Sequence, residues 1–174
     1  MKPAARYSPI AAIVHADRRA ADILVGAFAA ELIHAGHAVH GLVQHRPPGG
    51  KTGAMLIDLH DGTQHALFQN LGSGSESCSV DTASLAMASL ALRRALDARA
   101  ELAIANRFGP LEADGGGLAA EMLALMAEGI PFLTIVPDIL LPAWRNFTGG
   151  LGIELPAERA ALHAWFASQV NERR

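Results

Sequence analysis

The stretch that decides the fold is residues 10–44, which read IAAIVHADRRAADILVGAFAAELIHAGHAVHGLVQ. Its first six residues form an apolar run without alternation, which is typical of a strand buried on both faces of a sheet. Asp17 stands where a helix N-cap is expected, and Gly36 is of the type that ends helices. A second apolar run at residues 38–44 predicts another strand. Strand, helix and strand joined by short turns make a βαβ unit, which predicts parallel neighbouring strands and a right-handed crossover.

The alternation of strands and helices continues along the chain. Further buried strands are expected at residues 101–106 and 130–136, and further helices at 82–98 (with Asp81 as N-cap), 118–128 and 157–170. Residues 137–156 show no such period and are expected to be irregular. Because no internal repeat or domain boundary stands out, we predict a single α/β domain over residues 1–174, a three-layer sandwich with a mostly parallel sheet.

A hairpin is expected to add an antiparallel ribbon to this sheet. Residues 55–60 and 63–69 flank Asp61-Gly62, the dipeptide that favours a two-residue type I′ turn. The expected cross-strand pairs are Met55 with Phe68, Ile57 with Ala66, and Asp58 with His65. One face of the hairpin is then apolar, and the other pairs a carboxylate with an imidazole.

Length, charge and composition indicate where the protein works and which classes of partner it lacks. The 174 residues can bury a substantial core, and a formal net charge of −3 removes the electrostatic basis for binding nucleic acid. A single cysteine cannot form an internal disulfide, as is usual in a reducing cytoplasm. No apolar run approaches the ~18 residues that span a bilayer, and the first residues lack the apolar segment of a secretory signal. We therefore expect a cytoplasmic protein without nucleic-acid or membrane partners.

Two segments bear on phosphate binding through a P-loop. Gly50-Lys51-Thr52 resembles the end of that motif, but its first glycine would fall at His45, and a strand is expected to follow instead of a helix. The turn after the first strand, residues 15–19, is where a P-loop belongs, yet it contains no glycine. Asp17 also places a negative charge at the helix end that favours anions. We expect no functional P-loop.

Ligands of open parallel sheets bind beyond the carboxyl ends of the strands. Connections 15–19, 106–117 and 137–152 are expected to meet there. The main candidates in the second connection are Asn106, Arg107, Glu112, Gly115, Gly116 and Gly117. Arg107 offers a fork for oxyanion oxygens, and the glycines leave backbone N–H groups accessible. Arg107→Ala is then expected to weaken ligand binding without unfolding the protein. The alternative is that Arg107 and Glu112 pair to brace the loop.

Two other segments are candidates for the same site. The Gly/Ser-rich segment 72–81 has the composition of an anion-binding nest, or else of a linker, and its candidate contacts are Ser73, Gly74, Ser75 and Cys78. Trp144 could cover a pocket as a lid hinged at Gly149 and Gly150, or anchor a long loop to the core.

No metal site is predicted from the histidines. His34, His37 and His40 are close in sequence, but Gly36 ends the helix between the first two. They therefore share no helical face, and zinc needs three or four converging ligands.

The element order resembles the thermophile-type nucleoside-triphosphatases, a branch of the P-loop fold. Residues 49–53 (GGKTG) and the following hairpin stand where that family has a Gly-Lys/Arg loop and a hairpin. Residues 106–112 (NRFGPLE) stand where it has an acidic motif of the form Asp-Glu-Ile-Gly-Pro-Met-Glu. The P-loop is missing and the acidic pair has become Asn106-Arg107, which suits magnesium poorly, so hydrolysis is not carried over.

Over nearly its whole length, the chain more closely resembles an uncharacterised bacterial family often encoded near molybdate transport genes. The shared features are Asn-Arg-Phe-Gly-x-x-Glu before a glycine run, a Gly/Ser loop with a Cys and an Asp, and residues 147–150 (FTGG). The resemblance implies an NTPase-like fold without its P-loop, and a connection to molybdate.

These observations predict a non-hydrolysing protein that binds a small anion or a nucleotide. The connection to molybdate metabolism comes from the resemblance alone. One alternative is a nucleoside-triphosphate or phosphate hydrolase in which Glu112 orients water. A second is a protein-interaction scaffold, and an Ala-rich composition leaves a homodimer open. The sequence identifies no cofactor.

Overall fold

The computed structural model describes residues 8–47, 53–66, 68–69, 79–80 and 82–173. The strands of its main sheet, in spatial order, are β4 (Gln64–Ala66), β3 (Met55–Asp58), β2 (Val39–His45), β7 (Leu102–Ala105), β8 (Phe132–Pro137), β1 (Ile10–His15) and β9 (Ile153–Leu155). The helices are α1 (Arg18–His34), α2 (Thr82–Asp97), α3 (Pro110–Ala113), α4 (Ala119–Ala127), α5 (Leu141–Phe147) and α6 (Arg159–Glu172), with a 3₁₀ turn η1 (Asp138–Leu140). A separate ribbon pairs β5 (Phe68–Gln69) with β6 (Ser79–Val80).

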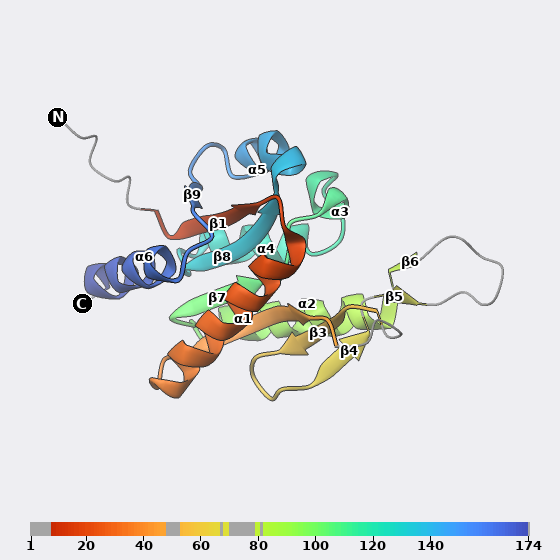
Figure 1. The fold of residues 1–174 in the computed structure, drawn as a ribbon, viewed down its shortest axis with the longest axis horizontal. Coiled ribbons are helices and arrows are strands. Elements are labelled where there is room, and N and C mark those ends of the chain that lie inside the picture. Colours follow the sequence, from red (N-terminus) through yellow and green to blue (C-terminus); the bar gives the residue numbers. More distant parts are fainter. Residues whose placement is uncertain (1–7, 48–52, 67, 70–78, 81, 174) are drawn as a thin grey trace.

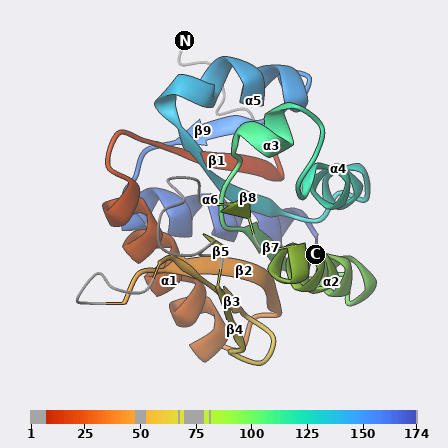
Figure 2. The same cartoon turned by 90° about the vertical axis from the view of Figure 1, so that its right-hand side faces the viewer.

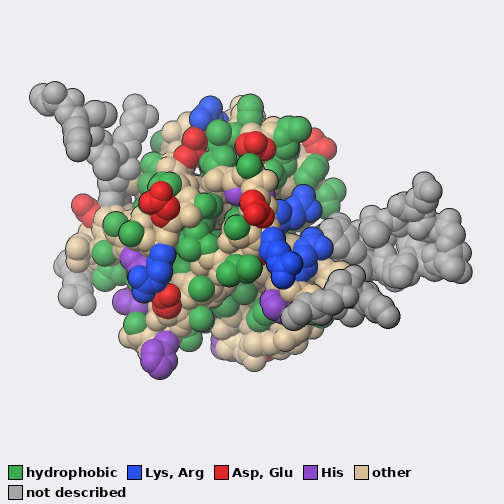
Figure 3. All heavy atoms as spheres, viewed as in Figure 1, with side chains coloured by type: hydrophobic (Ala, Val, Ile, Leu, Met, Phe, Trp, Pro, Cys, Tyr) green, Lys and Arg blue, Asp and Glu red, His purple; other side chains and the backbone are tan. Residues whose placement is uncertain are grey.

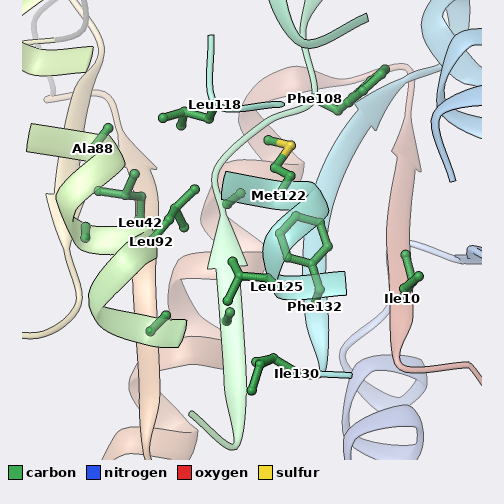
Figure 4. Packing of buried hydrophobic residues seen from close by; sticks show 14 of the residues in the cluster. Ile10, Leu42, Ala88, Leu92, Phe108, Leu118, Met122, Leu125, Ile130 and Phe132 are labelled. Atoms are coloured by element: carbon green, nitrogen blue, oxygen red, sulfur yellow. The ribbon is translucent and has the colours of Figure 1, made fainter. Parts of the chain in front are cut away.

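The predicted three-layer α/β sandwich is confirmed. Helices α1 and α6 cover one face of the sheet, and α2 and α4 cover the other (Figures 1 and 2). Two apolar clusters fill the two interfaces, and Figure 4 shows Leu92, Met122 and Phe132 in the cluster under α2 and α4. Strands β2, β7, β8, β1 and β9 run parallel. Parallel sheets are covered by helices on both faces, which agrees with the continuous apolar runs in the sequence.

The helix of the first βαβ unit, α1, begins at the N-cap that the sequence predicted. The Asp17 carboxylate accepts hydrogen bonds from the backbone N–H groups of Arg19 (3.0 Å) and Ala20 (3.2 Å), so it caps α1. The two strands of the unit are not neighbours, however, because β7 and β8 lie between β2 and β1. The expectation of adjacent strands was therefore wrong, although the strands are parallel.

The hairpin β3–β4 has a different register from the one predicted. The observed pairs are Met55 with Ala66, Leu56 with His65, and Ile57 with Gln64. The turn has four residues instead of two, because the Asp58 carboxylate accepts from the N–H of His60 (2.9 Å) and the Asp61 carboxylate accepts from that of Thr63 (2.9 Å). Asp58 consequently pairs with Arg94 of α2 (2.9 Å) and not with His65.

The sequence pattern suggested that residues 137–156 are irregular, and the structure shows that they are not. They contain η1, α5 and β9, and β9 pairs in parallel with β1 at the sheet edge. A helix of seven residues and a strand of three are too short to show a period. Both are held by tertiary contacts that local sequence does not display.

Candidate functional site

A cleft of about 280 Å³ opens at the carboxyl ends of β2, β7 and β8. Its polar lining residues are Arg18, Gln44, Arg46, Asn106, Arg107 and Glu112. Its apolar lining residues are Leu56, Leu85, Ala88, Phe108, Pro110, Leu111, Leu118 and Pro137. The cleft therefore lies at the sheet edge where the strand order predicts a ligand.

Arg107 is the most firmly held of the cationic side chains at this cleft. Its Nη2 forms an ion pair with buried Asp22 of α1 (2.5 Å) and donates to the backbone carbonyl of Arg18 (3.1 Å). Its Nη1 lies 3.0 Å from Nε2 of His15. The alternative pair between Arg107 and Glu112 does not form, because α1 supplies the carboxylate that binds Arg107.

Three guanidinium groups gather at the cleft from three separate elements. Arg18 begins α1, Arg46 follows β2, and Arg107 follows β7. Burial lowers the pKa of Arg107 most; Asp22 raises it, and the charges of Arg18 and Arg46 lower it further. Figure 3 shows Lys and Arg side chains gathered on the right of the visible face, beside the start of α1 in Figure 1. Such clustered cations repel one another, and an anion bound between them relieves that repulsion.

Asn106 and Gln44 form a buried amide pair in the same lining. The Asn106 Nδ2 donates to the Gln44 Oε1 over 3.3 Å. The Gln44 Nε2 and the Asn106 Oδ1 make no hydrogen bond within the described part of the chain. The pair therefore keeps the Gln44 amino group as a donor and the Asn106 carbonyl oxygen as an acceptor for a ligand.

Glu112 uses both oxygens to brace its own loop. Its Oε2 accepts from the backbone N–H of Gly109 (2.9 Å), and its Oε1 accepts from that of Leu118 (3.0 Å). The side chain is buried, and its bond to the N–H of Gly109, the N-cap of α3, is the half of a capping box that a glycine at this position allows. This geometry stabilises the loop that forms one wall of the cleft.

Residues 10–165 match the family model described as "Protein of unknown function (DUF2478)". The chain belongs to the DUF2478 family.

The DUF2478 chain also resembles one curated protein and two solved structures. It is 39% identical over 160 residues to "Molybdenum import ATP-binding protein ModC 2" of Bradyrhizobium diazoefficiens (strain USDA 110). The match covers 90% of this chain but only 18% of that relative's length.

The two solved structures show the same fold. The "Solution Structure of a Human Cancer-Related Nucleoside Triphosphatase" has a TM-score of 0.63 at 16% identity, covering 95% of this chain and 99% of that one. The "Crystal Structure of THEP1 from the hyperthermophile Aquifex aeolicus" also has a TM-score of 0.63, at 13% identity, covering 91% and 96%. The NTPase-like fold inferred from the motifs is thus confirmed.

The sequence suggested that the glycine run of the DUF2478 chain presents free N–H groups, but two of its three glycines use theirs within the loop. The N–H of Gly115 donates to the Glu112 carbonyl (3.0 Å), and that of Gly116 donates to the Leu111 carbonyl (2.8 Å). Gly117 has a φ of +55°, and a Cβ there would overlap the Glu112 carboxylate. The glycines therefore shape the loop around Glu112, and none of the three lines the cleft.

Trp144 is not a lid over the cleft of the DUF2478 chain. Its side chain is 0% exposed and packs against Phe108, Phe132 and Phe147. Of residues 137–152, only Pro137 lines the cleft. The alternative interpretation, that Trp144 anchors its segment to the core, is the one the structure supports, and Trp144 is left out of the proposed site.

Several predicted contacts lie outside the described residues. These are Ser73, Gly74, Ser75 and Cys78, together with the expected helix cap Asp81 and the Gly50-Lys51-Thr52 segment. Within the described ranges, no group of three or more His, Cys, Asp or Glu side chains could hold a metal ion. No helix among them is long and apolar enough to cross a membrane.

Sequence reasoning missed Gln44 and Arg46 as site residues. Both lie at the carboxyl end of β2, which is parallel to β7 and ends at the same edge. The rule that placed the other connections there applies to β2 as well.

His15 gives the site a measurable dependence on pH. A guanidinium only donates, so the Nε2 that faces Arg107 accepts and His15 is neutral. Burial first, and then the charge of Arg107, lower the pKa of His15; Asp22 and Asp138 raise it, and Arg18 lowers it. Between pH ~6.5, where a histidine of the unfolded chain titrates, and the lower pKa in the folded protein, the unfolded state binds more protons.

The free energy of unfolding is therefore expected to fall as pH is lowered below about 6.5. His15→Asn retains an acceptor but does not titrate, so its unfolding free energy should decline less between pH 7 and pH 5. Urea unfolding of both proteins at several pH values measures the difference. Equal declines would show that His15 is not responsible.

Glu112→Gln is expected to lower the free energy of unfolding by about 1–3 kcal/mol. The substitution keeps the shape of the side chain but turns an amide N–H₂ toward a backbone N–H of Gly109 or Leu118. Urea unfolding measures the loss, with Asp114→Asn, at an exposed position of the same loop, as the matched control. A variant as stable as the control would contradict the bracing role.

Proposed function

We propose that this chain binds a small anionic ligand at the arginine-lined cleft and does not hydrolyse it. The observation that carries the proposal is the convergence of Arg18, Arg46 and Arg107 from three elements on one cleft. Within the described residues, neither Arg18 nor Arg46 has a carboxylate partner, whereas Arg107 is held in place by Asp22. Two unpaired guanidinium groups beside one fixed group suit the oxygens of a phosphate or another oxyanion.

Two further observations support binding without hydrolysis. The Asp17 carboxylate already occupies N–H groups at the start of α1, which a P-loop protein would offer to phosphate. Both oxygens of Glu112 accept from the backbone, which leaves that carboxylate poorly placed to orient an attacking water. The hydrolase alternative would gain support if turnover were measured and were lost in Glu112→Gln beyond the loss of stability.

A connection to molybdate is supported by one observation. The curated relative is named a molybdenum import ATP-binding protein, and the region it shares with this chain is a small part of its length. We propose that molybdate is one of the anions to be tested, alongside Mg·ATP. Sulfate, which is similar in shape and charge, is the comparison that separates a specific oxyanion site from a general one.

The first test is a thermal-shift titration with Mg·ATP, molybdate and sulfate in parallel. A ligand at about a hundred times its dissociation constant adds about 2.7 kcal/mol to the free energy of unfolding, which corresponds to several degrees here. No shift with any ligand would overturn the proposal and favour an interaction scaffold.

Arg46→Ala is expected to weaken binding of the anion that gives a shift by about tenfold, the equivalent of one charge-assisted hydrogen bond. Titration calorimetry of that anion measures the change in dissociation constant. Arg19→Ala is the matched control, because Arg19 is also an exposed arginine near this edge but does not line the cleft. Equal effects of the two substitutions would remove Arg46 from the site.

A further inference from the structure

The volume and the apolar lining of the cleft suit a ligand larger than a bare oxyanion. Its volume of about 280 Å³ lies just below the range of about 300–1,000 Å³ that is usual for organic ligands, which suits a small one. Beyond the arginines, the lining is dominated by apolar side chains from α2 and the 108–118 loop. A tetrahedral oxyanion gains nothing from such a wall and loses hydration against it.

The apolar side chains of the cleft come from two separate elements. Leu85 and Ala88 come from α2, whereas Phe108, Leu111 and Leu118 come from the loop that Glu112 braces. Leu85 is half-buried and Leu111 is 47% exposed, so both have accessible apolar area that a ligand could cover. A flat ring in the cleft would bury the apolar area that these side chains leave accessible.

The amide pair supplies the polar recognition that such a ring needs. Gln44 and Asn106 together retain an unused amino group, which donates, and an unused carbonyl oxygen, which accepts. This remains so if both amide groups are turned over, because their mutual hydrogen bond always uses one nitrogen and one oxygen. A neighbouring donor and acceptor complement the edge of a heterocyclic base.

We infer that the ligand is a phosphate ester of a flat heterocycle, of the nucleoside monophosphate class. The ring lies in the apolar cleft with its edge on Gln44 and Asn106, and the phosphate lies on Arg18 and Arg46. The inference rests on the proposed function, since the same arginines bind the anionic group. It adds the organic part of the ligand and places the phosphate on arginine side chains instead of on the backbone N–H groups that Asp17 caps.

The test compares AMP, GMP, CMP and UMP with inorganic phosphate and adenosine by titration calorimetry. At least one nucleotide is expected to bind tenfold or more tightly than phosphate, and adenosine more weakly than AMP. Leu85→Gln is expected to weaken binding of that nucleotide at least tenfold and to leave binding of phosphate unchanged. Leu90→Gln is the matched control, because Leu90 is an exposed leucine on α2 outside the cleft.

The outcomes separate this inference from the proposed function. If phosphate or molybdate binds and no nucleotide binds more tightly, the heterocycle is excluded while the anion site stands. If a nucleotide binds but Leu85→Gln and Leu90→Gln behave alike, its ring does not lie in this cleft and the inference is overturned. If neither nucleotides nor oxyanions bind, the proposed function itself fails.

Discussion

Replacing Arg107 by alanine is expected to lower the free energy of unfolding by about 3–5 kcal/mol. The Arg107 guanidinium and the Asp22 carboxylate are 13% and 6% exposed, so the substitution leaves a buried charge without its partner. This is a large fraction of the about 5–15 kcal/mol that stabilises a typical domain. The sequence predicted that Arg107→Ala weakens ligand binding without unfolding the protein, with a bracing role for Arg107 as the alternative; the structure adds this large loss of stability.

A double-mutant cycle tests the role of the ion pair. Arg107→Met alone and Asp22→Leu alone should each be strongly destabilising, whereas the double variant should recover much of the loss because no charge remains buried. Urea unfolding gives the four free energies. Additive losses in the double variant would show that the two side chains do not act as a pair.

Replacing Trp144 by alanine is expected to lower the free energy of unfolding by about 3–5 kcal/mol, the usual loss for a buried aromatic side chain. The indole is fully buried and has ring contacts with Phe108 (5.3 Å between centroids) and Phe132 (6.5 Å). Truncation therefore leaves a cavity between α5 and the sheet. Trp144→Phe should lose less, because it retains an aromatic ring and removes an indole Nε1 that is buried without a partner among the described residues.

Urea unfolding and ligand titration together distinguish a core role for Trp144 from a lid. If Trp144 is a core residue, Trp144→Ala lowers the free energy of unfolding and Trp144→Phe keeps its ligand affinity. A lid residue would show the reverse, with stability retained and affinity lost in both variants. That second pattern would contradict the placement of Trp144 described above.

Three residues of the predicted site lie together in the structure, and their role in binding a ligand stays a prediction. Asn106, Arg107 and Glu112 line a cleft at the carboxyl ends of the strands. The hydrogen-bond partners of Arg107 and Asn106 were not predictable, because Asp22 lies 85 residues from Arg107 in sequence and Gln44 lies 62 from Asn106. A motif shows which side chains reach an edge of the sheet, but not which of them the fold uses for its own stability.

The sequence by itself determined the layers of this protein, because continuous apolar runs and helical spacing are local patterns with a direct physical cause. It also determined the cap at Asp17, which depends on contacts two and three residues away. Only the tertiary structure decided the order of the strands, the ion-pair partner of Asp58, and which cleft residues stabilise the fold. In each of these, the deciding contact joins residues that are far apart in sequence, such as Asp58 and Arg94 of α2. Their free energy appears only once the sheet and its helices have packed.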